Sequence, residues 1–197
     1  VAPRSIDRLS MLQLRSFLQE AGHAYIIAEA GLNHNGDFDL AVQLICAAAT
    51  AGVDAIKFQN FTTEDFVTDK SVMYTYKSQG KEVTESFWEL CKRCEVPQEW
   101  IPRLKKVADD YGIDFLSTPT STHGVDDLVA VKVKALKNGS DYLSHLPLLK
   151  YMGSTGLPVI LSTGMALEEE VRDAVAAVRS GGSSPIIILH CTSCYPT

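Results

Sequence analysis

The sequence predicts an α/β fold of the TIM (β/α)8 barrel type, with about six of the eight strands present in this chain. Six short apolar runs alternate with stretches of helical periodicity, and such alternation is typical of a parallel sheet. The spacing is even, and no Gly-x-Gly-x-x-Gly fingerprint follows the first strand. These features favour a barrel over an open doubly wound sheet. Because the sixth run ends just before Tyr195, we expect either a fragment or an open sheet.

The first strand-helix-strand unit is the part around which the other elements are arranged. Residues 25–28 predict a buried strand, because the run is apolar, too short for a helix and closed by a glycine. Residues 33–36 predict a turn, and Asp37 is placed to cap the following helix, which ends near Gly52. Residues 53–58 predict the second strand. A parallel pair of this kind brings three polar residues to one edge of the sheet: Glu29, Lys57 and Gln59.

The remaining elements follow from the same patterns. Apolar residues at helical spacing predict helices at residues 85–94, 98–111, 123–131, 146–152 and 167–178. Apolar runs rich in β-favouring residues predict strands at residues 113–119, 133–136, 159–164 and 186–192. Residues 60–84 are polar and irregular, which indicates a functional loop or lid.

Two units are expected along the chain. Residues 5–21 carry an amphipathic pattern, so residues 1–23 predict an N-terminal helical extension. Residues 24–197 predict the incomplete barrel.

Composition limits the classes of protein to which the chain can belong. With 197 residues, 46% hydrophobic and 21% charged, the sequence is typical of a soluble globular protein. The net charge is −6, so no basic footprint indicates nucleic acid. No apolar run approaches the roughly 20 residues of a membrane helix, and no signal peptide is recognised. We therefore expect a cytoplasmic protein that binds neither nucleic acid nor membrane.

The five cysteines do not predict a disulfide framework. Cys91-x-x-Cys94 and Cys191-x-x-Cys194 together resemble a zinc signature. The two pairs are nearly 100 residues apart, which is far beyond the roughly 15–20 residues of a zinc ribbon. The first pair also falls on a predicted helix, so we expect no structural zinc.

Polar residues gather where the predicted strands end, which is where parallel α/β folds place their chemistry. Two lysines with several hydroxyls predict a seat for a small phosphorylated or carboxylated anion, and an acid and a histidine could move protons. The alternative is structural: Glu29 and Lys57 neutralise each other, and each hydroxyl caps a turn. The set is Glu29, Lys57, Gln59, Ser117, Thr118, Lys137, Ser140, Asp141, Ser162, Thr163, His190, Thr192 and Ser193.

Several motifs carry a resemblance to a known family: IIAEAGLNHNGDFDLA, AIKFQNF, FLSTP, ALKNGSD, PVILSTGMA and LHCTSCYPT. In this order and spacing, residues 24–197 closely resemble the sialic acid synthase family, which comprises N-acetylneuraminate synthase and its legionaminate, pseudaminate and spore-coat relatives. The resemblance implies a (β/α)8 barrel that condenses phosphoenolpyruvate with an N-acylated aldose, typically N-acetylmannosamine. The products are a nine-carbon 2-keto sugar acid and phosphate.

The resemblance also implies roles for single residues. Glu29, Lys57 and Lys137 are implied to be catalytic. Contacts to phosphoenolpyruvate are implied for Lys57, Thr118, Lys137, Ser140, Ser162 and Ser193, and contacts to the sugar for Glu29, Gln59 and Tyr195. Asp141 is assigned to substrate binding, although family members carry their acid one residue later, where this chain has Tyr142. Asn138 replaces a usually apolar residue.

A divalent metal, Mn²⁺ or Mg²⁺, normally polarises the aldehyde in this family. Its two histidine ligands lie on the last two barrel strands, so no metal ligand is expected in this chain, and the C-terminal antifreeze-like domain is also expected to be absent. The resemblance implies a homodimer for the complete enzyme and an inactive chain when these 197 residues stand alone.

Two other functions remain open from the sequence. A lysine Schiff-base aldolase on the same barrel would use Lys57 or Lys137 as the nucleophile. An inactive anion-binding fragment would keep the lysines and hydroxyls without the metal.

Overall fold

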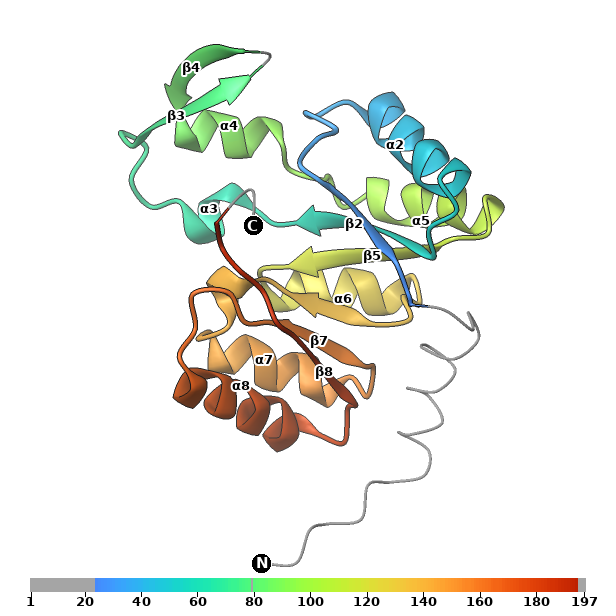
Figure 1. Ribbon diagram of the computed structural model, residues 1–197, viewed down its shortest axis with the longest axis vertical. Helices are drawn as coiled ribbons and strands as arrows, with labels where there is room; N and C mark the ends of the chain where they lie inside the picture. The colour runs from blue at the N-terminus through green and yellow to red at the C-terminus, as the bar shows by residue number, and fades with distance from the viewer. Residues whose placement is uncertain (1–23, 79, 195–197) are drawn as a thin grey trace, which may run out of the picture.

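The computed structural model describes residues 24–78 and 80–194, and it has an α/β fold (Figure 1). Parallel strands form two three-stranded sheets. The first has the order β1-β2-β5, with β1 Ile27–Gly31, β2 Ala55–Asn60 and β5 Asp114–Pro119. The second has the order β6-β7-β8, with β6 Leu136–Asn138, β7 Val159–Ser162 and β8 Ile186–Leu189. Strands β5 and β6 lie side by side, so the two sheets meet there.

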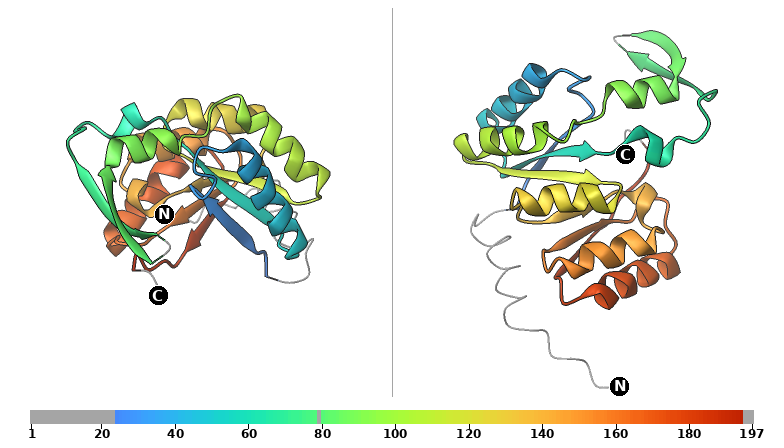
Figure 2. Two further views of the ribbon diagram at one scale, coloured as in Figure 1. Left: turned by 90° about the horizontal axis from the view of Figure 1, so that it is seen from above. Right: turned by 180° about the vertical axis from the view of Figure 1, so that it is seen from behind.

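Helices connect these strands, as the alternating pattern of the sequence predicts. They are α2 Phe38–Thr50, α5 Trp100–Asp110, α6 Thr122–Ala130, α7 Leu146–Ser154 and α8 Glu168–Gly181. The predicted cap is confirmed, because the Asp37 carboxylate accepts a hydrogen bond from the backbone N–H of Leu40 at 3.0 Å. Seen from behind, α5, α6, α7 and α8 lie on one side of the strands (Figure 2).

Alternation along the strands gives the sheets two different faces. On the face toward the helices, large side chains such as Phe58 and Phe115 belong to the main hydrophobic core. The opposite face carries a smaller apolar cluster made of Ala55, Leu116, Ala135 and Ile160. Lys57 lies two residues after Ala55 on β2, and Lys137 on β6 lies two residues after Ala135, which immediately precedes that strand. Both lysines are therefore on the same face as the smaller cluster. The small cluster is therefore the floor beneath the two lysines.

Residues 60–84 are not the irregular loop that the sequence predicts. The helix α3 Thr63–Phe66 is followed by an antiparallel hairpin of β3 Met73–Ser78 and β4 Lys81–Ser86, which leads into α4 Phe87–Arg93. The hairpin stands away from the parallel sheets, beside α4 (Figure 1). Cross-strand pairs stabilise it, including Thr75 with Thr84. Gly80, between two stretches that contain β-favouring residues, was the available sequence signal.

Several predicted boundaries also shift. The fourth parallel strand is residues 136–138 rather than 133–136, so Lys137 lies within the strand and not after it. Glu29 likewise lies inside β1. The predicted helix at residues 5–21, and Tyr195, lie outside the described residues. Within the described residues, no helix has both the length and the apolar character needed to cross a membrane.

Candidate anion-binding site

Two lysines from neighbouring sheets lie on the same face of the fold, above the floor cluster. Lys57 is 9% exposed and Lys137 is 6% exposed. Burying an ammonium group costs free energy unless it has charged or hydrogen-bonding partners. The partners of the two lysines therefore determine what the site can bind.

Lys57 has a charged partner. Its Nζ lies 2.5 Å from Glu29 Oε2, and it donates a hydrogen bond to Thr118 Oγ1 at 3.2 Å. The geometry follows from the strand register, because Glu29 is directly opposite Lys57 in the β1-β2 pair. The Glu29 side chain is 49% exposed, so its carboxylate is also accessible to a ligand.

Among the residues that the structure describes, the hydrogen-bond partners of Lys137 are neutral. Its Nζ donates to Ser162 Oγ and, at 2.6 Å, to the backbone carbonyl of Asn138. Burial and the repulsion of the nearby Lys57 ammonium lower the pKa of Lys137 to about 8. The negative charges of Cys191, Glu29 and Asp141 oppose that shift without cancelling it. Lys137 is a buried cation whose positive charge is only partly compensated.

Two hydroxyl groups lie around Gly164, beside these lysines. Ser140 begins a 3₁₀ turn, Ser140–Tyr142, after β6, and its Oγ accepts a hydrogen bond from the Gly164 N–H at 3.0 Å. A Cβ placed on Gly164 would lie 2.2 Å from Ser193 Oγ and 2.9 Å from Ser140 Oγ. The missing side chain at Gly164 therefore lets both hydroxyls approach the backbone. A cavity of about 190 Å³ opens here, lined in part by Ser140, Asp141 and Gly164.

Asn138 has a structural role that the sequence analysis did not find. It is fully buried, and its Nδ2 donates to the backbone carbonyl of Tyr142 at 3.2 Å. The bond ties the end of β6 to the turn that carries Ser140. This hydrogen bond explains why a polar side chain is found at a buried strand end, where an apolar one is usual. The signal was the asparagine itself, at a position where an apolar residue is expected.

Cys191 is a second residue that sequence reasoning missed as a member of the site. Burial raises the pKa of its thiol, but hydrogen bonding with Ser162 and with the N–H groups of Thr163 and Gly164, together with the charge of Lys137, outweighs burial and lowers the pKa overall. Its Sγ lies 3.6 Å from the Leu189 carbonyl oxygen. The Cys191-x-x-Cys194 spacing was the only sequence signal for a special thiol.

Among the other predicted residues, Gln59 lies at the site, whereas no hydrogen bond or ion pair joins the rest to either lysine in the part of the chain that the structure describes. Gln59 lies beside Glu29, since a Cβ on Gly31 would be within 3.8 Å of Gln59 Nε2 and 3.1 Å of Glu29 Oε1. Thr163 donates to the Leu189 carbonyl at 2.8 Å, which is a structural bond. Ser117 is buried, and it pairs with Phe58 in the register rather than with Lys57. Asp141, His190 and Thr192 are exposed.

The residues that the structure describes do not form a metal centre. Among residues 24–78 and 80–194, no group of three or more His, Cys, Asp or Glu side chains is arranged to hold a metal ion. Cys91 and Cys94 are buried in an apolar cluster with Phe61 and Val67, so they are core residues. The described residues therefore do not fit the divalent cation that the family resemblance implies.

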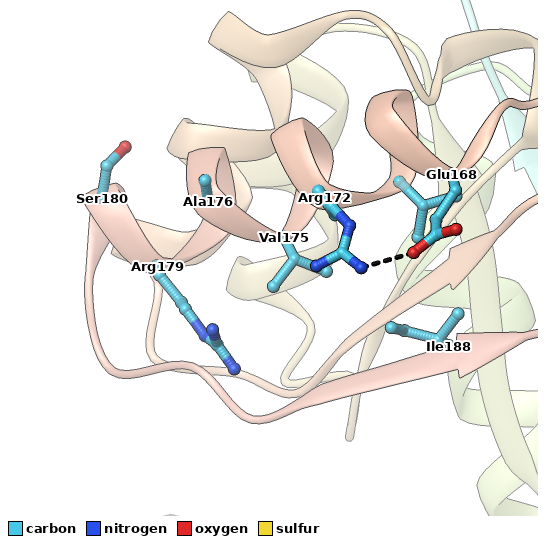
Figure 3. A pocket seen from close by; sticks show the side chains of 8 residues that line it. Glu168, Arg172, Val175, Ala176, Arg179, Ser180 and Ile188 are labelled. Carbon is cyan, nitrogen blue, oxygen red and sulfur yellow. Dashed lines mark hydrogen bonds and ion pairs between the residues drawn. The ribbon is translucent and has the colours of Figure 1, made fainter. Parts of the chain in front are cut away.

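A larger groove lies elsewhere on the molecule. Its volume is about 680 Å³, and it runs along α8 and the edge strand β8. Figure 3 shows that its lining combines apolar side chains such as Val175 and Ile188 with charged ones, including an ion pair between Glu168 and Arg172. Lys57 and Lys137 line neither this groove nor the smaller cavity. The smaller cavity is the better candidate because its lining includes Ser140 and Asp141, two of the residues that the sequence predicts for the site.

Comparison with known proteins gives consistent results. The N,N'-diacetyllegionaminic acid synthase of Legionella pneumophila is 38% identical over 176 residues, which cover 87% of this chain and 49% of that protein. The chain spans about half the length of the curated relatives that it matches.

Solved structures agree with the sequence relatives. The crystal structure of N-acetylneuraminic acid (sialic acid) synthetase from Leptospira borgpetersenii, in complex with citrate, superposes with a TM-score of 0.76 at 35% identity, over 88% of this chain and 55% of that one. A truncated 3-deoxy-D-arabino-heptulosonate 7-phosphate synthase from Thermotoga maritima shares the fold, with a TM-score of 0.57 at 15% identity over 88% of this chain and 53% of that one. The model of the NeuB family matches residues 44–197. The chain belongs to the NeuB family.

Proposed function

We propose that this chain is the anion-binding part of a longer synthase that condenses phosphoenolpyruvate with an N-acylated aldose such as N-acetylmannosamine. The products would be a nine-carbon 2-keto sugar acid of the sialic acid type and inorganic phosphate. Family membership and the named relatives support the reaction class. On this proposal the six parallel strands correspond to the first part of an eight-stranded barrel.

The observation that carries the proposal is the incomplete compensation of the Lys137 charge. This ammonium is 6% exposed, bonded to neutral oxygens and repelled by Lys57. An anion that bridged the two lysines would relieve both the burial cost and the repulsion. Phosphoenolpyruvate carries a carboxylate and a phosphate, so it can supply negative charge to both ammonium groups.

The residues of this chain would bind and orient the donor substrate. Lys57 and Lys137 would hold its two anionic groups, and the hydroxyls of Thr118, Ser140 and Ser193 would donate hydrogen bonds to its oxygens. In the reaction the enol carbon forms a bond to the aldehyde carbon of the sugar, and water adds to the cation that develops at the former enol carbon. Phosphate then leaves with cleavage of its C–O bond. Fixed ammonium groups stabilise the departing phosphate.

Glu29 is the candidate for contact with the acceptor sugar. It is held by Lys57 at one oxygen, and its side chain is half exposed. A carboxylate in this position accepts hydrogen bonds from sugar hydroxyls. Gln59 lies next to it and adds an amide that both donates and accepts. No step is assigned to a metal ion, because the described residues form no cluster that would hold one.

A phosphate-release assay tests the proposal in the full-length protein. Phosphoenolpyruvate, N-acetylmannosamine and Mn²⁺ are supplied together, and calorimetry measures phosphoenolpyruvate binding separately. We expect phosphate release that depends on both substrates, at about 1 per second or more. Binding of phosphoenolpyruvate without turnover on any N-acylated aldose would leave only the anion seat. Absence of both would refute the proposal.

One observation favours a second candidate, a lysine Schiff-base aldolase. With a pKa of about 8, about a tenth of Lys137 is the neutral amine at pH 7, and a neutral amine is the nucleophile of such enzymes. Borohydride added with pyruvate would reduce an imine and increase the mass of the Lys137 peptide. The synthase proposal predicts no such adduct, so peptide mass mapping separates the two functions.

A further inference from the structure

We propose that Cys191 and Cys194 form a thiol-modification site. Oxidation of the two thiols to a disulfide weakens binding at the anion seat, the group formed by Lys57, Lys137, Ser140 and Ser193. This inference rests on the proposed function, because it concerns the regulation of the same site. The two cysteines are free thiols in the segment that follows β8. Cys191 is half-buried and Cys194 is exposed. Ser193, one of the hydroxyls of the seat, lies between them in the sequence.

The surroundings of Cys191 favour reaction at its sulfur. The thiol lies beside Ser162 Oγ, the N–H groups of Thr163 and Gly164, and the ammonium of Lys137. These groups stabilise a negative sulfur, and the thiolate is the form that attacks oxidants. Cys194 has the accessibility needed by the second cysteine of such a pair. One reactive and one exposed thiol is the combination found at redox-sensitive sites.

The chain length between the two cysteines permits a bond. Cys191 and Cys194 are the first and last of four consecutive residues, and in a β-turn the Cα atoms of such residues lie within about 7 Å. A disulfide requires a Cα separation of about 4.4–6.8 Å. The chain already bends at Ser193 and Cys194. Both cysteines follow the end of β8 at Leu189, so closing the turn leaves the β7-β8 pairing in place.

The oxidant of the proposed reaction is a hydroperoxide. The Cys191 thiolate attacks one oxygen of hydrogen peroxide and the O–O bond breaks, which gives a sulfenic acid and, after protonation of the leaving hydroxide, water. The Cys194 thiol then attacks the sulfenic sulfur, the S–S bond forms and a second water leaves. Two thiols are oxidised and one peroxide is reduced to two waters. A dithiol reductant reverses the change by thiol exchange.

Closing this ring changes the anion seat through Ser193. Ser193 is drawn into a four-residue loop, which displaces its hydroxyl from the position beside Gly164 and Ser140. This change removes a preorganised hydrogen-bond donor from the anion seat. The expected result is weaker binding of phosphoenolpyruvate.

The chain contains its own control, since Cys91 and Cys94 have the same spacing. Cys91 lies in the last turn of α4 and Cys94 is the residue that caps this helix, and both side chains are buried. Burial raises the pKa of the Cys91 thiol, and burial likewise raises the pKa of the Cys94 thiol. Both thiols are therefore protonated and shielded from peroxide. We expect this pair to remain reduced under conditions that oxidise Cys191 and Cys194.

The experiment treats the reduced full-length protein with hydrogen peroxide, removes the peroxide with catalase, and measures peptide masses and phosphoenolpyruvate affinity by calorimetry. We expect a loss of two hydrogens, about 2 Da, in the peptide containing residues 191–194. The dissociation constant should rise at least tenfold and return to its starting value with dithiothreitol. The Cys194→Ser variant should bind like wild type when reduced. After peroxide its Cys191 should proceed to a sulfinic acid that dithiothreitol does not reverse.

Three results would overturn the inference: no disulfide in residues 191–194, a disulfide without loss of affinity, or a Cys194→Ser variant that loses and regains affinity as wild type does. A different result would count against the proposed function instead. If the reduced protein does not bind phosphoenolpyruvate, the assignment of Lys57 and Lys137 to this anion is wrong. The peptide masses still show whether the disulfide forms.

Discussion

Lys57 lies on the central strand of the first sheet and Lys137 on an outer strand of the second, and their charges are compensated in opposite ways. Lys57 on β2 is paired with a half-exposed carboxylate at 2.5 Å. Lys137 on β6 is bonded to a hydroxyl and a backbone carbonyl, and its pKa falls to about 8. The position of each lysine along its strand places an ammonium group in the site. The side chain that it contacts on the neighbouring strand, Glu29 on β1 or Ser162 on β7, determines whether that charge is compensated. An anion would be drawn most strongly to the uncompensated side.

Removal of either charge should have the largest effect. Lys57→Met and Lys137→Met, each in the full-length protein, should lower kcat/KM for phosphoenolpyruvate by about 30- to 1000-fold, or about 2–4 kcal/mol. If the comparison holds, Lys137→Met is the more damaging of the two, because Glu29 already offsets part of the Lys57 charge. Steady-state kinetics with each substrate varied in turn measures the effect. A change confined to the sugar would contradict the assignment.

The same comparison has a pH test. Because kcat/KM reports groups of the free enzyme, it should fall for phosphoenolpyruvate as the pH rises through about 8, where Lys137 loses its proton. Lys137→Arg keeps its charge throughout this range and should lack that fall, whatever its absolute rate. A wild-type profile that is flat from pH 7 to pH 9.5 would show that Lys137 carries no essential charge.

As the pH rises and Lys137 loses its proton, the free energy of unfolding should increase, whereas activity should fall. Below pH 8 both the folded and unfolded chains hold the Lys137 proton, and the fold bears the full cost of burying the charge. Between about 8 and the ordinary 10.5, the unfolded chain binds more protons, so stability rises with pH. Lys137→Met should therefore stabilise the protein at pH 7, by about 2–3 kcal/mol more than at pH 10. Denaturant unfolding at both values measures this, and an equal effect at both pH values would exclude a buried charge.

A smaller effect is expected from Gly164→Ala, which tests the hydroxyls near Lys137. The new methyl group would lie 2.2 Å from Ser193 Oγ and 2.9 Å from Ser140 Oγ, so both side chains must move. Loss of one or two hydrogen bonds to phosphoenolpyruvate predicts about tenfold weaker binding. The matched control is Gly156→Ala, where φ is +78° with open space around the site. That variant should lose stability, by about 1 kcal/mol, and keep its affinity.

The smallest effect on stability should come from Glu29→Gln, on the Lys57 side. The Glu29 side chain is 49% exposed, so loss of the ion pair should cost less than about 1 kcal/mol. Activity should fall while phosphoenolpyruvate affinity stays near that of wild type, since the carboxylate is assigned to the sugar. Thermal unfolding measured beside the kinetics decides the matter. A large drop in the melting temperature with unchanged kinetics would mean that Glu29 serves only to pair with Lys57.

Sequence reasoning succeeded where a local pattern determines the outcome. Alternation along a strand is enough to place Lys57 on the same face as Ala55, and parallel connection is enough to bring Glu29 opposite it. The helix starting after Asp37 was equally readable from its cap. These features depend on residues close together in the chain or on a single strand-helix-strand unit.

It failed where the outcome depends on segments far apart. The lowered pKa of Lys137 needs Lys57, which lies 80 residues earlier, and no local pattern reveals that neighbour. The role of Asn138 depends on the turn that follows β6. The β3-β4 hairpin was missed because its polar, glycine-containing turn outweighed the alternation on either side.

The apolar floor beneath the lysines limits the directions from which a ligand can reach them. Ala55, Leu116, Ala135 and Ile160 are each no more than 2% exposed and pack into one cluster. If phosphoenolpyruvate binds to the two lysines as proposed, it would enter from the side opposite this cluster, at the strand ends, and phosphate would leave from the same side. On that proposal we expect free phosphate to compete with phosphoenolpyruvate in the full-length protein.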